Sequence, residues 1–253
     1  MTTPSLRLVA VIPVYDHGET VAAVITALRA VWAELPVILV DDGSHATCAA
    51  TLRERAATDN GIQLITHPEN RGKGAAVLTG LAAAAERGFS HALQIDADGQ
   101  HDPEALPRFF AAMRAHPQAA IIGYPRYAHD VPKGRLYGRY LTHIWVWINT
   151  LSLRIRDSMC GLRIYPLAAV IPLFASLARA TRMDFDPEIL VRLDWAGTPI
   201  ENLPVAVRYP EGGRSHFRLW KDNARIARMH ARLFFGMLRR LPRLLFRLCG
   251  RPQ

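Results

Sequence analysis

Short apolar runs alternate with segments of helical periodicity along most of this chain, and this alternation restricts the fold more than any other feature. The run LRLVAVIPVY is followed by ETVAAVITALRAVWAEL, PVILVDD by TCAATLRERAA, IQLITH by GAAVLTGLAAAAERG, and HALQIDAD by PEALPRFFAAMRAH. Strands and helices in this order form right-handed βαβ units. The sequence therefore predicts an α/β fold with a Rossmann-like, mostly parallel sheet flanked by helices.

Size and cysteine content narrow the class of protein further. A chain of 253 residues with 50% apolar composition can bury a full core, and we expect one large domain with a tail. The cysteines Cys48, Cys160 and Cys249 are too few and too scattered for a disulfide framework or a zinc site. The segment MTTPSLRLVAVIPVY lacks the features of a signal peptide. These features predict a cytoplasmic protein.

The positive charge of the chain is concentrated in its tail. The whole chain has 31 Lys and Arg and 22 Asp and Glu residues, a net charge of +9. From Arg214 to Arg251 there are 11 basic residues and one acid, Asp222, which leaves 20 basic and 21 acidic residues elsewhere. A near-neutral body with a basic tail differs from a uniformly basic nucleic-acid-binding domain, which argues against a nucleic-acid partner.

The tail has the periodicity of a basic amphipathic helix, kinked at Pro242. Its arginines recur at helical spacing: Arg225, Arg228, Arg232, Arg239, Arg243 and Arg247. Its apolar residues follow a similar rhythm: Ile226, Met229, Leu233, Met237, Leu241, Leu244 and Leu248. We expect this helix to lie on an anionic membrane surface. The alternative is a helix that packs on the body and leaves its arginines in solvent.

The segment YLTHIWVWINTLSL at 140–153 is a second candidate for a membrane contact. It is uncharged, but its 14 residues are too short to span a bilayer. Trp145 and Trp147 are compatible with a core helix, with the membrane interface or with an acceptor groove.

Polar side chains follow three of the predicted strands. These are Tyr15 and Asp16, then Asp41 and Asp42, then Asp96 and Asp98. Ligands of open α/β sheets bind outside the carboxyl ends of the strands, so these groups are expected at one edge. Asp96 and Asp98 lie at alternate positions and offer the oxygen ligands that Mg²⁺ or Mn²⁺ prefers. This pattern predicts a nucleotide site with a divalent metal.

Two predicted helix starts lie near these acids. Asp102 precedes Pro103 and Glu104, which is typical of an N-cap. Lys73 stands between two glycines at another helix start, where free N–H groups favour an anion. Neither a P-loop nor a GxGxxG fingerprint is present, so Lys73 is either a phosphate contact or a solvated lysine at a glycine-rich helix entry.

Five motifs in this order resemble the family 2 glycosyltransferases of GT-A fold, in particular their dolichol (polyprenyl) phosphate mannose synthase branch. They are VIPVYDHGETV, VILVDDGS, NRGKGAAVLTG, IDADGQHDPEAL and DSMCGLRIYP. The resemblance covers roughly residues 6–212. It implies an inverting enzyme that transfers a hexose from a nucleotide diphosphate sugar, with Mg²⁺ or Mn²⁺ on the diphosphate.

The resemblance also implies roles for single residues. Asp42 matches the acid that recognises the nucleoside, and the expected metal ligands are Asp96, Asp98 and Gln100. The expected donor-binding residues are Pro13, Tyr15, Asp16, Asp41, Asp42, Gly43, Lys73, Asp96, Ala97, Asp98, Gln100 and Arg126. The expected catalytic residues are Asp98, Asp157 and Arg163, of which Arg163 also contacts phosphate.

The acceptor decides whether the reaction needs a general base. A lipid phosphate is already ionised, whereas a hydroxyl must lose a proton to a carboxylate. The candidates for that base are Asp157, which we favour, and Asp184, Asp186 and Glu188, which also fit an acid-rich helix start. The expected acceptor-binding residues are Arg163, Arg214, Ser215 and His216, the last three on a loop that closes over the site.

These expectations divide the chain into a glycosyltransferase domain at 1–213 and an acceptor loop with a membrane-surface helix at 214–253. The predicted protein is a metal-dependent hexosyltransferase at the inner face of the membrane, with a nucleotide diphosphate sugar and a lipid-linked, polyprenyl phosphate acceptor as substrates. One alternative is transfer to a hydroxyl of a lipid or polyene. The other is a non-catalytic protein that docks on membranes and keeps the fold.

Overall fold

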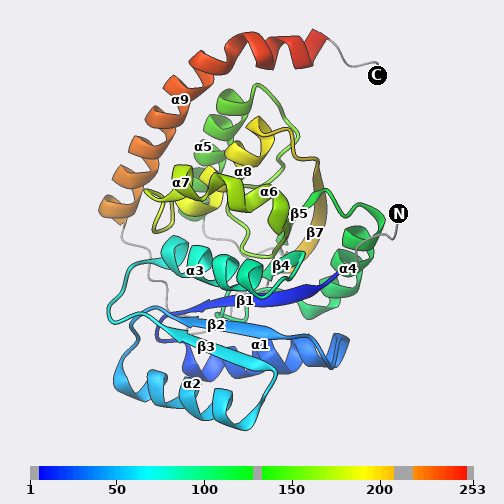
Figure 1. Ribbon diagram of the computed structural model, residues 1–253. Coiled ribbons are helices and arrows are strands. Elements are labelled where there is room, and N and C mark those ends of the chain that lie inside the picture. Colours follow the sequence, from blue (N-terminus) through cyan, green and yellow to red (C-terminus); the bar gives the residue numbers. More distant parts are fainter. Residues whose placement is uncertain (1–5, 128–132, 208–218, 250–253) are drawn as a thin grey trace.

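The computed structural model describes residues 6–127, 133–207 and 219–249 of the chain (Figure 1). In these residues seven strands form one sheet in the order β3-β2-β1-β4-β6-β5-β7. Only β6 runs antiparallel to its neighbours, β4 and β5. The strands are β1 (Leu8–Val14), β2 (Val37–Asp41), β3 (Ile62–Thr66), β4 (His91–Gln94), β5 (Ala120–Tyr127), β6 (Arg163–Pro166) and β7 (Ile200–Val207). The predicted mostly parallel sheet is confirmed.

Helices cover both faces of this sheet (Figure 1). One core lies under α1 (Gly18–Val31), α2 (Ala46–Thr58), the short η1 (Pro103–Ala105) and α4 (Leu106–Ala115). The second core lies under α3 (Lys73–Glu86), α6 (Leu167–Val170), η2 (Ile171–Leu173), α7 (Phe174–Leu177) and α8 (Phe185–Trp195). The remaining helices, α5 (Lys133–Thr150) and α9 (Leu219–Cys249), pack against α8 and against each other.

The central strands are apolar because helices bury both of their faces. Every residue of β2 is buried, and α3 lies so close to the sheet that a Cβ on Gly80 would stand 2.3 Å from Val11 Cγ1. Glycine is therefore required for this approach. The close packing fixes the start of α3, and with it Lys73, at the carboxyl edge of the sheet.

The reversed direction of β6 brings a further segment to the same edge. Strands β1, β2, β4 and β5 end there, whereas β6 begins there at Arg163. The loop 157–162 leads into β6 and therefore lies next to the residues that follow β4. This strand reversal adds residues to the functional edge that a purely parallel sheet would not place there.

The tail forms the predicted helix, α9, a helix of 31 residues that contains Pro242 and curves over in its last part (Figure 1). Five of its apolar side chains are buried against the body: Ile226, Met229, Leu233, Met237 and Leu244. The expected boundary between residues 213 and 214 lies outside the described residues. In the part of the chain that the structure describes, no helix is both long and apolar enough to cross a membrane.

Candidate active site

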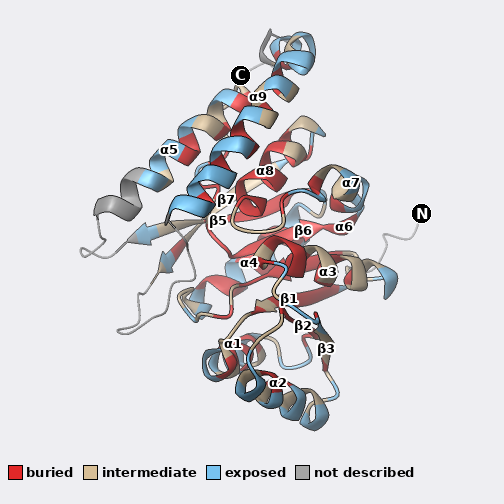
Figure 2. Cartoon of the chain, turned by 90° about the vertical axis from the view of Figure 1, so that its left-hand side faces the viewer, coloured by how far each residue is buried: buried red, intermediate tan, exposed pale blue. Residues whose placement is uncertain are grey.

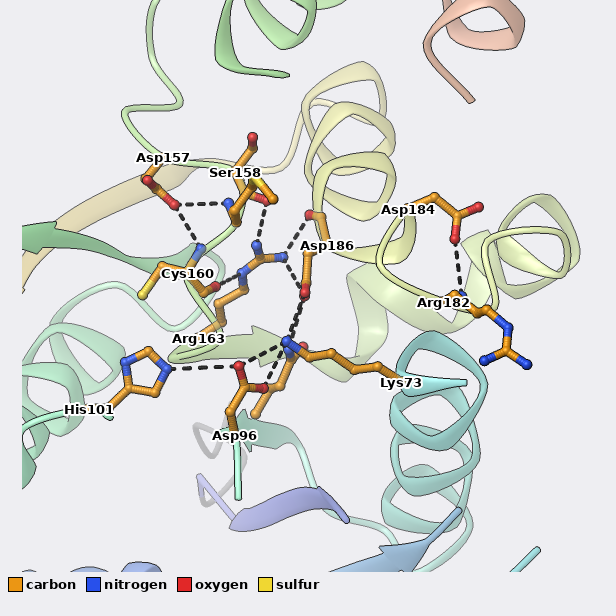
Figure 3. Close-up of polar contacts among 12 residues, drawn as sticks. Lys73, Asp96, His101, Asp157, Ser158, Cys160, Arg163, Arg182, Asp184 and Asp186 are labelled. Carbon is orange, nitrogen blue, oxygen red and sulfur yellow. Dashed lines mark hydrogen bonds and ion pairs between the residues drawn. The ribbon is translucent and has the colours of Figure 1, made fainter. Parts of the chain in front are cut away.

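The acids that follow β4 lie in a buried network of charges at the carboxyl edge of the sheet (Figure 3). The ammonium group of Lys73, at the start of α3, lies 2.8 Å from Asp96 Oδ1 and 2.8 Å from Asp186 Oδ2 of α8. Burial alone would lower the pKa of Lys73, but the charges of Asp186 and Asp96 raise it above its ordinary value. Lys73 thus carries a permanent positive charge that offsets two carboxylates.

Asp98 lies beside this network, and among the described residues no cation pairs with it as Lys73 pairs with Asp96. Burial first, and then the charge of Asp96, raise the pKa of Asp98 above its ordinary value. The N–H of Gln100 donates a hydrogen bond to Asp98 Oδ1 at 3.0 Å. In the described part of the chain, the turn 98–100 therefore presents a carboxylate without an ion-pair partner, and such a carboxylate favours an external cation.

A cavity of about 70 Å³ opens at these acids. Asp96, Asp98, Gln100, His101 and Arg139 supply its polar lining, and the loop that leads into β6 closes one side. A Cβ on Gly161 of that loop would lie 2.0 Å from Asp96 Oδ2, so only glycine allows the loop to approach this closely. The cavity thus has carboxylates on one wall and a guanidinium on another.

The metal ligands expected from the sequence meet in this cavity, which is lined by Asp96, Asp98 and Gln100 together. Among the described residues, no cluster of three or more His, Cys, Asp or Glu side chains is arranged to hold a metal ion. The donor set of the protein is therefore two carboxylates and one amide. It matches a cation that takes its remaining ligands from water and phosphate.

The acids after β2 organise the neighbouring loops. Asp42 is 2% exposed and accepts hydrogen bonds from the N–H groups of Arg71 and Gly72 at 2.9 and 2.7 Å. Asp41 accepts one from the N–H of Ser44 at 2.9 Å. These carboxylates hold the start of α3 and the turn at 43–44 in place. Their expected contact with a nucleoside stays a prediction.

The other expected donor residues line the same edge. Gly43 has a φ of 72°, and its Cβ would lie 2.5 Å from the backbone of Glu69. Asp16, with a φ of 55°, accepts a hydrogen bond from the N–H of His45 at 2.8 Å. Pro13 and Tyr15 are half-buried, Ala97 is buried, and Arg126 is exposed at the end of β5.

The candidate base Asp157 is enclosed by partners from α5. Arg139 donates two hydrogen bonds to its carboxylate, at 2.6 and 2.7 Å, and His143 Nε2 lies 3.1 Å away. Burial alone would raise the pKa of Asp157, but the hydrogen bond from His143 and the charge of Arg139 hold it well below its ordinary value. A carboxylate that binds protons so weakly is a poor general base.

Arg139 and His143 were not among the site residues expected from the sequence. Both lie on the inner side of α5, one helical turn apart, and His143 Nδ1 also contacts Ser158 Oγ at 3.0 Å. Their spacing of four residues is the one signal that could have paired them. What they bind, the segment 157–158, cannot be read from that spacing.

Arg163, at the start of β6, is 0% exposed. Its guanidinium donates to the carbonyl oxygens of Cys160, Ser158 and Asp186 at 2.7 to 2.8 Å (Figure 3). The expected contact with a phosphate would require this side chain to leave these acceptors. As it lies, Arg163 joins the 157–162 loop to α8.

The remaining base candidates have structural partners as well. Asp184 accepts a hydrogen bond from the N–H of Arg182 at 3.0 Å, and burial raises its pKa. Glu188 is 0% exposed and pairs with Arg192 of its own helix and with Arg232 of α9.

Two further expectations concern residues near this edge. Asp102 is the N-cap of η1, as predicted, and accepts a hydrogen bond from the N–H of Glu104 at 3.0 Å. The expected acceptor residues Arg214, Ser215 and His216 lie outside the described residues.

Comparison with known proteins identifies the family of the chain. The model of glycosyl transferase family 2 matches residues 9–169. The undecaprenyl-phosphate mannosyltransferase of Micrococcus luteus is 26% identical over 217 residues, which are 83% of this chain and 87% of that protein. The human dolichyl-phosphate beta-glucosyltransferase is 30% identical over 191 residues, 70% of this chain and 57% of that protein.

Solved structures share the fold. Glucosyl-3-phosphoglycerate synthase from Mycobacterium tuberculosis, crystallised with Mn²⁺ and uridine-diphosphate-glucose, aligns with a TM-score of 0.63 over 98% of this chain and 81% of that chain, at 16% identity. The fold and the family implied by the five motifs are thus confirmed. The chain belongs to glycosyl transferase family 2.

Proposed function

We propose that the protein transfers a hexose, with inversion, from a nucleotide diphosphate sugar to a polyprenyl phosphate. The observation that carries this proposal is the cavity with Asp96 and Asp98 on one wall and Arg139 on another. The acids suit a metal-bound diphosphate, and the guanidinium suits the phosphate of an acceptor. The names of the relatives, which act on undecaprenyl and dolichyl phosphates, support the same acceptor class.

The residues at the cavity fit Mg²⁺ or Mn²⁺. Asp96 and Asp98 offer carboxylate oxygens and Gln100 an amide oxygen, and hard divalent cations prefer such ligands. The Lys73 ammonium pairs with Asp96 Oδ1 at 2.8 Å, whereas burial and the charge of Asp96 raise the pKa of Asp98, so a further cation would stabilise the ionised form of Asp98. When bound, the metal would offset the negative charge that develops on the leaving nucleoside diphosphate.

The protein side chains have separate tasks around this cavity. Lys73 keeps Asp96 ionised and in place. Asp41 and Asp42 hold the loops that form the nucleoside side of the site. The cation of Arg139, fixed by Asp157, orients the acceptor phosphate for attack on the sugar.

A phosphate acceptor also agrees with the state of the candidate base. Phosphate monoesters are ionised at neutral pH and need no proton acceptor. The lowered pKa of Asp157 makes it a weak base, which counts against transfer to a hydroxyl. Because a polyprenyl phosphate resides in a membrane, the protein works peripherally at the cytoplasmic face, with exposed arginines of α9 near anionic lipid.

The test is a transferase assay with the full chain. GDP-mannose and UDP-hexoses are offered with a polyprenyl phosphate, with and without Mn²⁺, and labelled lipid is counted. We expect one donor to support metal-dependent transfer and Asp98→Asn to reduce it about 100-fold. The melting temperature of this variant should not fall, because the fold disfavours the charge of Asp98.

Asp102→Asn is the matched control, since it changes an acid of the same segment that caps a helix outside the reaction. It should keep most of the activity. Equal activity of Asp98→Asn and the unchanged protein would refute the metal site. Absence of transfer to any polyprenyl phosphate would refute the acceptor class.

A further inference from the structure

The outer face of α5 is apolar. From residue 138 to residue 150, every exposed position of this helix carries an uncharged residue. Four large side chains form what we call the α5 face: Tyr140, Leu141, Ile144 and Ile148. Leu141 is 59% exposed. Surface helices of soluble proteins normally present charged residues at such positions, so this face marks a contact with an apolar partner.

Helix α9 has three faces rather than two. Its inner apolar residues pack on α5 and α8, as described above. A second apolar row, here called the outer stripe, stays exposed and consists of Trp220, Phe235, Leu238, Leu245 and Phe246. A third row consists of exposed basic residues: Lys221, Arg225, Arg228, Arg239 and Arg243. Arg240 is also exposed but lies over the ring of Trp195. The apolar residues that recur at helical spacing in the tail thus pack on the body, and a separate set of apolar residues faces outward.

The α5 face and the outer stripe form one surface. Trp145 of α5 contacts Phe234 of α9 with ring centroids 6.3 Å apart, and Phe234 contacts Phe235 at 6.0 Å. These rings fill the junction between the two helices, which lie side by side (Figure 2). The apolar residues of both helices therefore border each other, and the basic row of α9 lies beyond the outer stripe.

The charge of this region identifies the partner. The sequences of α5 and α9 contain a single acid, Asp222, which is only 5% exposed. A large apolar surface beside a row of exposed cations complements a bilayer that contains anionic lipid, where apolar side chains enter the acyl boundary and cations meet headgroups. A second copy of the chain would instead bring two basic rows together, at a cost in repulsion.

The inner side of α5 faces the active site. Arg139 and His143 alternate with the residues of the α5 face and bind Asp157, and Arg139 lines the cavity. One helix thus presents apolar residues outward and a cation inward. A lipid whose chain lies in the membrane and whose phosphate enters the cavity would meet both sides of this helix.

We propose that the α5 face and the outer stripe together dock the protein on an anionic bilayer, with α5 between the lipid and the cavity. The docking itself stands on exposure and charge. The further consequence, that docking delivers the acceptor phosphate to Arg139, rests on the proposed function. This assigns the main lipid contact to α5, and not to the tail helix alone.

The test compares two double variants of the full chain. Leu141→Glu with Ile144→Glu places two charges in the α5 face, and Val31→Glu with Ile171→Glu makes the same change at exposed apolar positions of α1 and η2. Flotation uses vesicles of phosphatidylcholine with and without phosphatidylglycerol. The affinity of the first variant for anionic vesicles should fall about tenfold or more, because glutamate replaces two apolar side chains that the bilayer would bury on docking. The control should bind like the unchanged protein.

Activity and stability separate docking from catalysis. With a short, water-soluble prenyl phosphate, the first variant should transfer sugar at the unchanged rate. With a long polyprenyl phosphate in vesicles, its rate should fall with its binding. The first variant should not melt below the control variant, since Leu141 and Ile144 are more exposed than Val31 and Ile171.

Several outcomes would overturn the docking proposal. They are vesicle binding by the first variant equal to that of the control, no vesicle binding by the unchanged protein, and a change from dimer to monomer without any lipid effect, which would identify a second copy as the partner. A different result would refute the proposed function alone. In that case the first variant loses flotation, which supports the docking surface, but the unchanged protein transfers sugar to no prenyl phosphate.

Discussion

The two halves of the active-site edge hold their acids by different means. On the side formed by β1 and β2, backbone N–H groups of short loops donate to Asp16, Asp41 and Asp42. On the side formed by α5, α8 and α9, arginine side chains pair with the acids Asp157, Glu188 and Asp194, and the N–H groups of Met159 and Cys160 also donate to Asp157. The first side relies on backbone N–H groups, with the rings of His45 and His67 beside Asp16 and Asp42, whereas the second side relies on arginine cations.

This difference has an energetic consequence. A carboxylate that accepts backbone hydrogen bonds loses some of them when it is changed, but it leaves no opposite charge behind. A carboxylate paired with an arginine leaves that cation without its partner in a partly buried place. The α5–α8–α9 side should therefore be the more sensitive to single changes of charge.

The largest expected effect is the difference in stability between Asp157→Asn and Asp42→Asn, which tests whether the α5–α8–α9 side is the more sensitive one. We expect the first change to lower the free energy of unfolding by about 3–5 kcal/mol, because Arg139 loses its partner. The second should cost about 1–3 kcal/mol, because asparagine keeps one acceptor oxygen for the partners of Asp42, which are the N–H groups of Arg71 and Gly72 and the ring of His67. Urea denaturation of both variants gives the values.

A double variant sharpens the same comparison. Adding Arg139→Met to Asp157→Asn removes the stranded cation and should restore part of the lost stability. Equal losses in Asp157→Asn and Asp42→Asn, with no recovery in the double variant, would mean that the two sides do not differ as described.

The difference between the two sides also explains which parts of the fold and of the site could be predicted from the sequence. The βα units up to β4 follow local periodicity, and the residues at the ends of β1, β2 and β4 were correctly expected at one edge, because parallel strands end together. The pairing of Arg139 with Asp157 spans the turn between α5 and β6, and the antiparallel direction of β6 depends on neighbours far along the chain. Neither leaves a periodic signal.

The tail shows the limit of periodicity most clearly. Its rhythm predicted a basic amphipathic helix, and α9 is such a helix. Periodicity could not tell which apolar residues would pack on the body, because that depends on what α5 and α8 offer. Leu233 is buried, whereas Phe235, two residues later, is 63% exposed.

The next expected effect concerns pH and the packing of α9 on α5. His230 of α9 is 3% exposed, stacks on Trp145 and lies 3.3 Å from Asn149 Nδ2. Burial lowers its pKa from 6.5 to about 4. The unfolded chain therefore binds a proton more readily than the folded one, and stability that is complete above pH 6.5 is lost as the pH falls toward 4.

Between pH 7.5 and pH 5 this linkage amounts to about 2 kcal/mol. Hydrogen exchange of the α9 amides should accelerate over this range, while that of β1 and β2 should change less. His230→Phe should flatten the pH dependence, since phenylalanine keeps the ring but cannot bind a proton. An unchanged pH profile in this variant would show that another group causes the effect.

The smallest expected effect tests whether the two sides differ in stability because their ion pairs are buried to different degrees, and not merely because one side contains arginines. Arg29 of α1 pairs with Asp59 at 3.1 Å on the β1–β2 side of the molecule, but the two side chains are 25% and 35% exposed. Water screens such a pair, so Arg29→Met should cost less than about 1 kcal/mol in urea denaturation. A loss as large as that of Asp157→Asn would show that ion pairs matter equally on both sides. A small loss of stability would show that the α5–α8–α9 side is sensitive because its charged pairs are buried. Sequence separation would not explain the difference, because Arg29 and Arg139 both pair with an acid far from them in sequence.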